Sequence, residues 1–146
     1  MKPTTQPERS GTELKLPGYR KLRVWQKAFE LAMLIYRLTD RFPPGNYRLI
    51  DQMRGAAISI FGNIAEGYTQ GSIGGYIRHC EISRGSLGEL VSYVYFCERS
   101  GLLAQADADL VNPLCNDVQQ MLGSLIIALH RKRRSGDWDR SYGATR

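Results

Sequence analysis

Two long helical patterns between residues 48 and 97 constrain the fold more than any other feature of the sequence. In both, apolar residues recur every three or four positions, as in helices that pack in a bundle. The first series is Leu49, Met53, Ala57, Ile60 and Ile64, and the second is Tyr76, Cys80, Ser83, Leu87, Leu90, Val94 and Cys97. We expect the rest of the chain to pack around this pair of helices.

Glycine is unusually frequent inside these two patterns. Gly55, Gly62, Gly85 and Gly88 all fall well within them, although a glycine inside a helix costs roughly 1 kcal/mol relative to alanine. Close approach of another backbone would offset that cost. Two interpretations remain open: either a neighbouring helix of the same bundle approaches these positions, or another chain or a ligand does.

The helix before this pair is expected from about Leu22 to Thr39. It ends at the sequence Phe42-Pro-Pro-Gly45, because proline cannot continue a helix. The second helix is expected over residues 47–66 and the third over residues 72–100, with Gly101 as the cap. A glycine-rich loop between them, with Gly67, Gly71, Gly74 and Gly75, matches neither the P-loop nor the dinucleotide-binding spacing.

A fourth helical pattern extends to about Arg134. Its start has two alternatives: the helix begins at Pro113, or it begins near Gln105 and kinks. Four helices with short connections predict an all-α fold, an up-down-up-down antiparallel four-helix bundle over residues 19–134. Residues 1–18 are expected to form a flexible lead and residues 135–146 a loose tail.

Composition narrows the range of functions. A chain of 146 residues with 42% hydrophobic content suits one domain, and a net charge of +6 favours polyanionic partners. Cys80, Cys97 and Cys115 lie too far apart to suggest a metal or redox motif, so they are expected in the core. The sequence shows neither a signal sequence nor the run of about 20 apolar residues that a membrane span needs, which predicts a cytoplasmic protein.

Positive charge is concentrated near the two ends of the predicted bundle sequence. Residues 1–48 carry ten Lys and Arg against four Asp and Glu. The start of the first helix and the end of the fourth share one end of such a bundle, which predicts a single basic patch, with Tyr19 and Trp138 available to stack on bases. The candidate nucleic-acid-binding residues are Arg20, Lys21, Arg23, Lys27, Arg131, Lys132, Arg133 and Arg134.

Polar residues on the second and third helices support two hypotheses. In the first they form a hydrogen-bonded network that fixes helix packing, with Glu66 paired to Arg84. This structural network would comprise Ser59, Asn63, Glu66, Arg84 and Ser86. In the second, Asn63, Glu66, His79 and Arg84 form the site of an enzyme. Since no nucleophile or metal motif can be found, no catalytic residue, cofactor or metal site is predicted.

Short motifs over residues 19–129 are similar to those of a known family. They are Val24-Trp25, Phe42-Pro43, Ser59-Ile60, Asn63-Ile-Ala-Glu-Gly67 and Gly85-Ser-Leu-Gly-Glu-Leu90. This combination resembles the bacterial four-helix-bundle family named after proteins encoded in 23S rRNA intervening sequences. The chain departs from the family at Gly55 and at Thr69-Gln70, where basic residues are usual.

The resemblance implies a closed bundle without enzymatic activity that assembles into a barrel-shaped homopentamer. Together with the charge, it predicts a cytoplasmic, non-catalytic homo-oligomer that binds RNA or a ribonucleoprotein partner through basic surfaces. The resemblance also implies an alternative, because related accessory proteins of diversity-generating retroelements bind a reverse transcriptase and its RNA. An enzyme is the second alternative.

Overall fold

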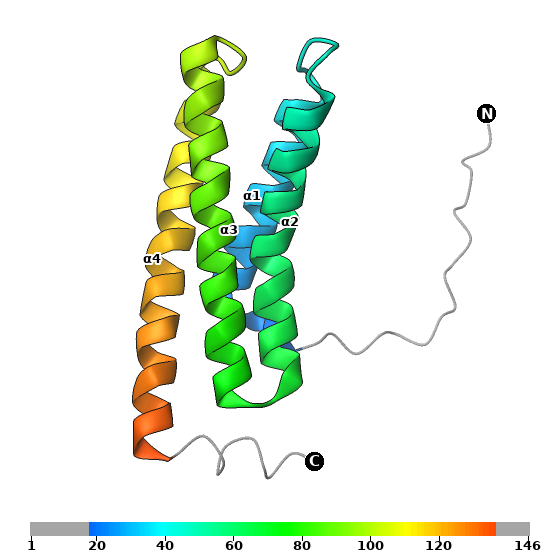
Figure 1. Cartoon of the computed structure of the whole chain (residues 1–146). Coiled ribbons are helices and arrows are strands. Elements are labelled where there is room, and N and C mark those ends of the chain that lie inside the picture. Colours follow the sequence, from blue (N-terminus) through cyan, green and yellow to red (C-terminus); the bar gives the residue numbers. More distant parts are fainter. Residues whose placement is uncertain (1–17, 137–146) are drawn as a thin grey trace, which may run out of the picture.

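A computed structural model describes residues 18–136, which form four antiparallel α-helices standing side by side (Figure 1). The helices are α1 (Arg23–Thr39), α2 (Tyr47–Gln70), α3 (Ile73–Ser100) and α4 (Gln105–Ser135), and a short 3₁₀ helix, η1 (Gly18–Lys21), precedes α1. Each helix packs against two neighbours, in the cyclic order α1, α2, α3, α4. The predicted all-α bundle is therefore confirmed, while the lead before residue 18 and the tail after residue 136 lie outside the described residues.

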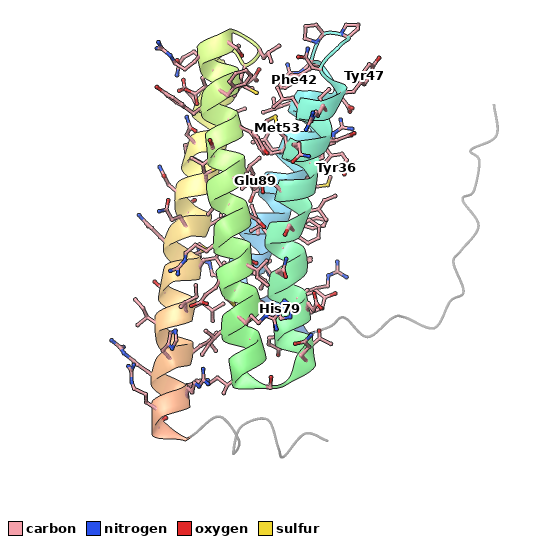
Figure 2. All side chains as sticks on the ribbon, viewed as in Figure 1. Tyr36, Phe42, Tyr47, Met53, His79 and Glu89 are labelled. Carbon is pink, nitrogen blue, oxygen red and sulfur yellow. The ribbon has the colours of Figure 1, made fainter. Side chains whose placement is uncertain are left out.

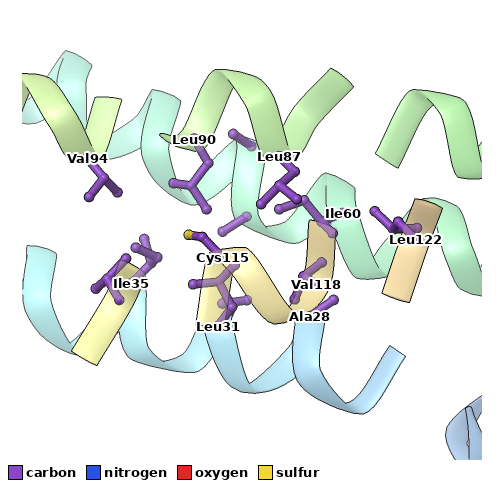
Figure 3. Packing of buried hydrophobic residues seen from close by; sticks show 14 of the residues in the cluster. Ala28, Leu31, Ile35, Ile60, Leu87, Leu90, Val94, Cys115, Val118 and Leu122 are labelled. Carbon is purple, nitrogen blue, oxygen red and sulfur yellow. The ribbon is translucent and has the colours of Figure 1, made fainter. Parts of the chain in front are cut away.

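Apolar side chains from all four helices meet along the axis of the bundle (Figure 3). Leu31 of α1, Ile60 of α2, Leu90 of α3 and Val118 of α4 are each 0% exposed. Burial of one such side chain contributes about 1.5–3 kcal/mol, and their helical spacing is why each segment forms an amphipathic helix. The core therefore comes directly from the sequence periodicity.

The connection between α2 and α3 is shorter than the sequence predicts. Instead of ending near Glu66, α2 continues to Gln70, and only Gly71 and Ser72 separate it from α3. Gly71 has a φ of 77°, in the left-handed region where glycine ends helices. The Ser72 hydroxyl then accepts a hydrogen bond of 3.1 Å from the Gly75 N–H and caps α3.

Gly67 is a buried helical residue where α2 packs closely on α3, and not the loop residue that the sequence predicts. A Cβ at this position would lie 2.8 Å from the His79 Cβ and 3.2 Å from the Tyr76 Cα. Only a hydrogen atom fits there. The backbones of α2 and α3 therefore come together because residue 67 has no side chain.

The glycines within the helical patterns are placed differently. A Cβ added at Gly55, Gly62, Gly85 or Gly88 would meet no other atom within 4 Å. Gly55, Gly85 and Gly88 are exposed on the bundle surface. The interpretation that they allow close packing of helices within one bundle is therefore wrong, and an approach by another chain or a ligand stays a prediction.

The start of α4 agrees with the earlier of the two alternatives. The helix begins at Gln105, and Pro113 lies inside it on the exposed side. Proline removes one backbone N–H from the hydrogen-bond ladder, but Val111 and Cys115 on either side are 0% and 4% exposed. Burial of these flanking side chains holds the first turns of α4 against the bundle.

All three cysteines are buried free thiols, as predicted. Burial raises the pKa of Cys80 to about 12, with a smaller contribution from the Glu81 carboxylate, and raises the pKa of Cys97 and Cys115 to about 11. At neutral pH these groups therefore remain protonated. A thiol in that state is a poor nucleophile and a poor metal ligand.

We expect this burial to make the fold less stable above pH 9. The unfolded chain releases its thiol protons near the ordinary pKa of 9.0, whereas the folded chain holds the Cys115 proton until about 11. The stabilisation is complete below pH 9 and is lost as pH rises, by up to about 1.4 kcal/mol per pH unit for each thiol. Urea unfolding between pH 8 and pH 10.5 should show a shallower decline for Cys115→Ala than for the wild type. Equal slopes would contradict the assignment.

Candidate functional site

Polar side chains form a ladder along the contact between α2 and α3. Its rungs join Gln52 to Tyr93, Ser59 to Ser86 and Glu66 to His79, and successive rungs are seven residues apart on each helix. Seven residues are close to two helical turns, so all three rungs lie on one side of the helix pair. The Tyr93 hydroxyl lies 3.3 Å from Gln52 Oε1, the two serine oxygens are 2.8 Å apart, and His79 Nδ1 lies 3.8 Å from Glu66 Oε2.

Asn63 connects two rungs of this polar ladder. Its Nδ2 donates to Ser59 Oγ at 3.0 Å and to the Ser59 carbonyl at 2.9 Å, while its Oδ1 lies 2.9 Å from His79 Nδ1. Because an amide oxygen only accepts, this contact places a proton on His79 Nδ1. The His79 side chain is 14% exposed, and Figure 2 shows it toward the end of the bundle that holds the α2–α3 turn.

The structure separates Arg84 from the other residues that the sequence groups with it. Glu66 lies near His79 and Gln70, and within residues 18–136 Arg84 forms no ion pair. Five residues along α3 rotate a side chain by about 140°, so Arg84 lies away from the helix face of His79. The predicted pairing of Glu66 with Arg84 is wrong, because sequence spacing alone did not account for this rotation.

The enzyme hypothesis requires Asn63, Glu66, His79 and Arg84 to converge. The first three do meet at the ladder, but Arg84 does not join them. In the described part of the chain, no group of three His, Cys, Asp or Glu residues is placed to hold a metal ion. What this cluster does in the structure is hold α2 and α3 in register.

A second candidate surface is the basic end of the bundle, where η1 and α1 begin, α3 begins and α4 ends (Figure 1). The Arg133 guanidinium reaches across to α3, 4.0 Å from where a Cβ on Gly74 would be. This contact shows that α4 ends beside the first turn of α3. We use the term basic end for Arg20, Lys21, Arg23, Lys27, Arg78, Arg131, Lys132, Arg133 and Arg134.

Arg78 belongs to this surface, although sequence reasoning missed it. It is exposed in the second turn of α3, next to the α2–α3 turn. Residues 49–100 carry four basic and five acidic side chains, so their composition gave no sign of a cationic surface. The antiparallel order of the helices was the available signal, because it places the start of α3 beside the end of α4.

Most cations of the basic end remain available to a ligand. All of them except the partly buried Lys27 are exposed. Lys27 Nζ lies 3.7 Å from Glu30 Oε2. No carboxylate among residues 18–136 forms an ion pair with Arg20, Lys21, Arg23, Arg78, Arg131, Arg133 or Arg134.

The aromatic side chains near this end pack against one another. The Tyr19 ring is 5.4 Å from Trp25, which in turn stacks on Phe29 at 5.1 Å and meets Phe61 edge-on at 6.2 Å. The Trp25 Nε1 is buried without a hydrogen-bond partner among residues 18–136, and the Arg20 guanidinium lies 5.9 Å from the indole ring. Tyr19 is thus a half-buried part of this cluster, its stacking on a base stays a prediction, and Trp138 lies outside the described residues.

An apolar hollow opens between α1 and α2 above this aromatic cluster. Its volume is about 230 Å³, and its lining residues are Phe29, Ala32, Met33, Tyr36, Ile58 and Phe61. Met33 and Ile58 are 52% and 42% exposed. Gly55 and Gly62 lie on the same helix as Ile58, three and four residues away, so this face combines exposed apolar side chains with bare backbone.

None of the four helices in residues 18–136 combines the length and the apolar character that crossing a lipid bilayer requires.

The bundle sequence matches a known protein family. Residues 20–124 fit the model of a family described as 23S rRNA-intervening sequence protein. The matched segment begins in η1 and ends within α4, so it covers most of the bundle but not residues 131–134 of the basic end. No curated protein matches the chain.

Proposed function

The chain belongs to the 23S rRNA-intervening sequence protein family, and from this premise we propose that it is a non-catalytic, homo-oligomeric bundle protein that binds RNA or a ribonucleoprotein partner through its basic end. The observation that carries the proposal is the presence of exposed cations from η1, α1, α3 and α4 at one end of the rod. Lysine and arginine that neutralise phosphates release counterions from nucleic acid, and this release supplies much of the binding free energy.

The position of these cations on the helices supports a binding role. Those in the last turn of α4 meet the negative end of the helix dipole and stabilise the helix. Arg20 and Lys21 of η1 and Arg23 in the first turn of α1 lie at the start of this helix, where the dipole is positive and a cation is unfavourable by roughly 0.3–1 kcal/mol. Because helix stability does not account for them, a polyanionic ligand is the simpler explanation.

Self-association is the second part of the proposal. The α1–α2 face presents Phe29, Met33 and Ile58 at 41%, 52% and 42% exposure, beside the unfilled positions of Gly55 and Gly62. Exposed apolar side chains gathered around a hollow are typical of protein–protein contacts. Another copy of the chain, packed on bare helix backbone, would offset the cost of glycine in α2.

Neutralising the end of α4 should weaken RNA binding at least about tenfold. The variant carries Arg131→Gln, Lys132→Gln, Arg133→Gln and Arg134→Gln. Its negative slope of log K against log salt should become shallower by about 0.7–0.9 for each phosphate that the variant no longer neutralises. A labelled RNA hairpin with single-stranded arms, titrated by fluorescence anisotropy between 50 and 300 mM salt (about a sixfold range), measures both quantities.

The matched control changes the same amount of charge elsewhere. It carries Arg37→Gln, Arg48→Gln, Arg84→Gln and Arg99→Gln, four exposed arginines that form no ion pair within residues 18–136. If both variants bound RNA equally weakly, net charge and not the basic end would be responsible. Unchanged affinity and salt slope in the α4 variant would refute the proposed site.

A further inference from the structure

The proposed function leaves open which form of RNA the basic end receives, and we infer that it receives base-paired RNA and contacts the phosphates of the duplex instead of its bases. The inference rests on the proposed function. It comes from what surrounds the cations: within the described residues, Tyr19, Tyr68 and Tyr76 beside them are buried or half-buried and each packs on another aromatic ring.

Single-stranded RNA is normally held by aromatic side chains that stack on unpaired bases. At the basic end these side chains are already in contact with one another. Tyr19 packs on Trp25, and the Tyr68 ring lies edge-on to Tyr76 at 6.0 Å, with Tyr76 only 3% exposed. Tyr19 and Tyr68 are also half-buried, so they are less open to a base than a free aromatic platform would be.

The most exposed aromatic side chains lie elsewhere on the rod. Tyr47, Tyr95 and Phe96 are 73%, 64% and 57% exposed. Tyr47 begins α2, and Figure 2 shows it with Tyr36 and Phe42 at the end opposite the α2–α3 turn. The three most exposed rings therefore lie away from the basic end, while Phe29, which is 41% exposed, packs on Trp25 and lines the hollow between α1 and α2.

Amide side chains that could read base edges near the basic end are also engaged. Gln26 Nε2 donates to the Arg20 carbonyl at 2.8 Å, and Gln70 Nε2 donates to Glu66 Oε1 at 3.5 Å. The remaining groups are arginines and lysines from several elements, which bind phosphate oxygens without regard to sequence. In A-form RNA the deep major groove is closed to side chains, so phosphates and 2′-hydroxyls are the accessible groups.

The higher charge density of a duplex favours binding of base-paired RNA over single-stranded RNA. The salt slope is about −0.9 per neutralised phosphate for a duplex and about −0.7 for a single strand. For about six neutralised phosphates, lowering the salt from 1 M to 0.1 M shifts the preference for the duplex over the single strand by roughly fifteenfold. One stacked base is worth roughly five- to 150-fold, so a single free aromatic platform in the upper part of that range would reverse the preference.

The test uses the full chain and three probes of about 20 nucleotides per strand, a length that exceeds the roughly 16 base pairs of a typical duplex-binding domain. The probes are a mixed-sequence RNA duplex, a second duplex of shuffled sequence, and an unstructured oligouridine. At 0.1 M salt we expect the duplexes to bind about tenfold more tightly than oligouridine and within about twofold of each other. Trp138→Ala should leave this ratio unchanged.

The outcomes separate this inference from the proposed function. Tight binding of oligouridine over the duplexes, or a loss of oligouridine binding alone in Trp138→Ala, would overturn the inference while RNA binding stands. A strong difference between the two duplex sequences would also overturn it, because phosphate contacts cannot read sequence. Absence of binding to any probe would refute the proposed function itself, and the inference with it.

Discussion

Replacing Gly67 with alanine is expected to lower the free energy of unfolding by roughly 1–3 kcal/mol, the usual cost of overpacking. Alanine is the better helix former by about 1 kcal/mol, so propensity alone predicts the opposite sign. The new methyl group would lie 2.8 Å from the His79 Cβ and 3.3 Å from the Tyr76 carbonyl oxygen. Since part of this clash is with backbone, α2 and α3 would have to move apart.

Gly62→Ala is the matched control on the same helix. Its Cβ would meet nothing within 4 Å, so within one chain the substitution should raise the free energy of unfolding by about 0.5–1 kcal/mol. Urea denaturation followed by circular dichroism measures both variants. Stabilisation of Gly67→Ala to the same extent as Gly62→Ala would disprove the close approach at residue 67.

The same pair of variants tests self-association. If another copy packs on the bare backbone of α2, Gly62→Ala should reduce the mass found by light scattering at a given concentration. Gly67 is buried within the bundle, so its substitution should affect assembly only through folding. A wild-type mass of one protomer at all concentrations would end the homo-oligomer proposal.

Replacing Arg54 with methionine should cost about 2 kcal/mol of stability, which would be the largest effect of any single arginine in residues 18–136. Arg54 Nε donates to Thr39 Oγ1 at 2.9 Å, and Nη2 donates to Asp40 Oδ1 at 2.7 Å and to the Tyr36 carbonyl at 3.3 Å. The guanidinium also lies 4.5 Å from the centre of the Tyr36 ring. These contacts bind α2 to the last turn of α1.

The magnitude follows from the burial of the partners. Thr39 is 1% exposed and donates its own hydroxyl proton to the Ile35 carbonyl at 2.7 Å, so loss of Arg54 leaves its oxygen with a buried, unused acceptor site. The Asp40 side chain is 74% exposed, and its ion pair contributes little. Methionine retains the apolar stem of the arginine side chain, so the change in stability reports the loss of the guanidinium alone.

Arg84→Met is the control for Arg54. Arg84 is exposed and makes no ion pair among the described residues, so its substitution should change stability by no more than about 0.5 kcal/mol. Thermal and urea unfolding of both variants provide the measurement. If the two substitutions had equal effects, the hydrogen bonds of Arg54 to Thr39, Asp40 and Tyr36 would contribute nothing measurable to stability.

The helices themselves could be predicted closely from the sequence. The first and third begin and end within about one residue of the expected positions, because proline and glycine stops are local chemistry. The end of α2 could not be predicted. A glycine in the sequence indicates the end of a helix unless the structure around it is known. At Gly67 the deciding factor is the backbone of α3, which lies across the space that a side chain would fill.

The candidate surfaces were likewise predicted from the sequence only in part. That the start of α1 and the end of α4 lie at the same end of the bundle follows from the number and order of the helices, whereas the inclusion of Arg78 required the three-dimensional arrangement. The polar ladder includes Ser59, Asn63 and Ser86 from the predicted network, but its histidine partner replaces the predicted arginine. The number of residues between two positions does not determine which side of a helix faces its neighbour.

By itself, the sequence determined that four amphipathic helices form, in what order they alternate, and which apolar side chains fill the core. These properties depend on hydrogen bonds within each helix and on a hydrophobic period that is visible along the chain. Only the tertiary structure decided that Gly67 and not Gly62 is a contact, that His79 and not Arg84 meets Glu66, and that Arg78 joins the basic end. Those outcomes depend on how far each helix is rotated and shifted against the next, which is set by packing between residues distant in sequence.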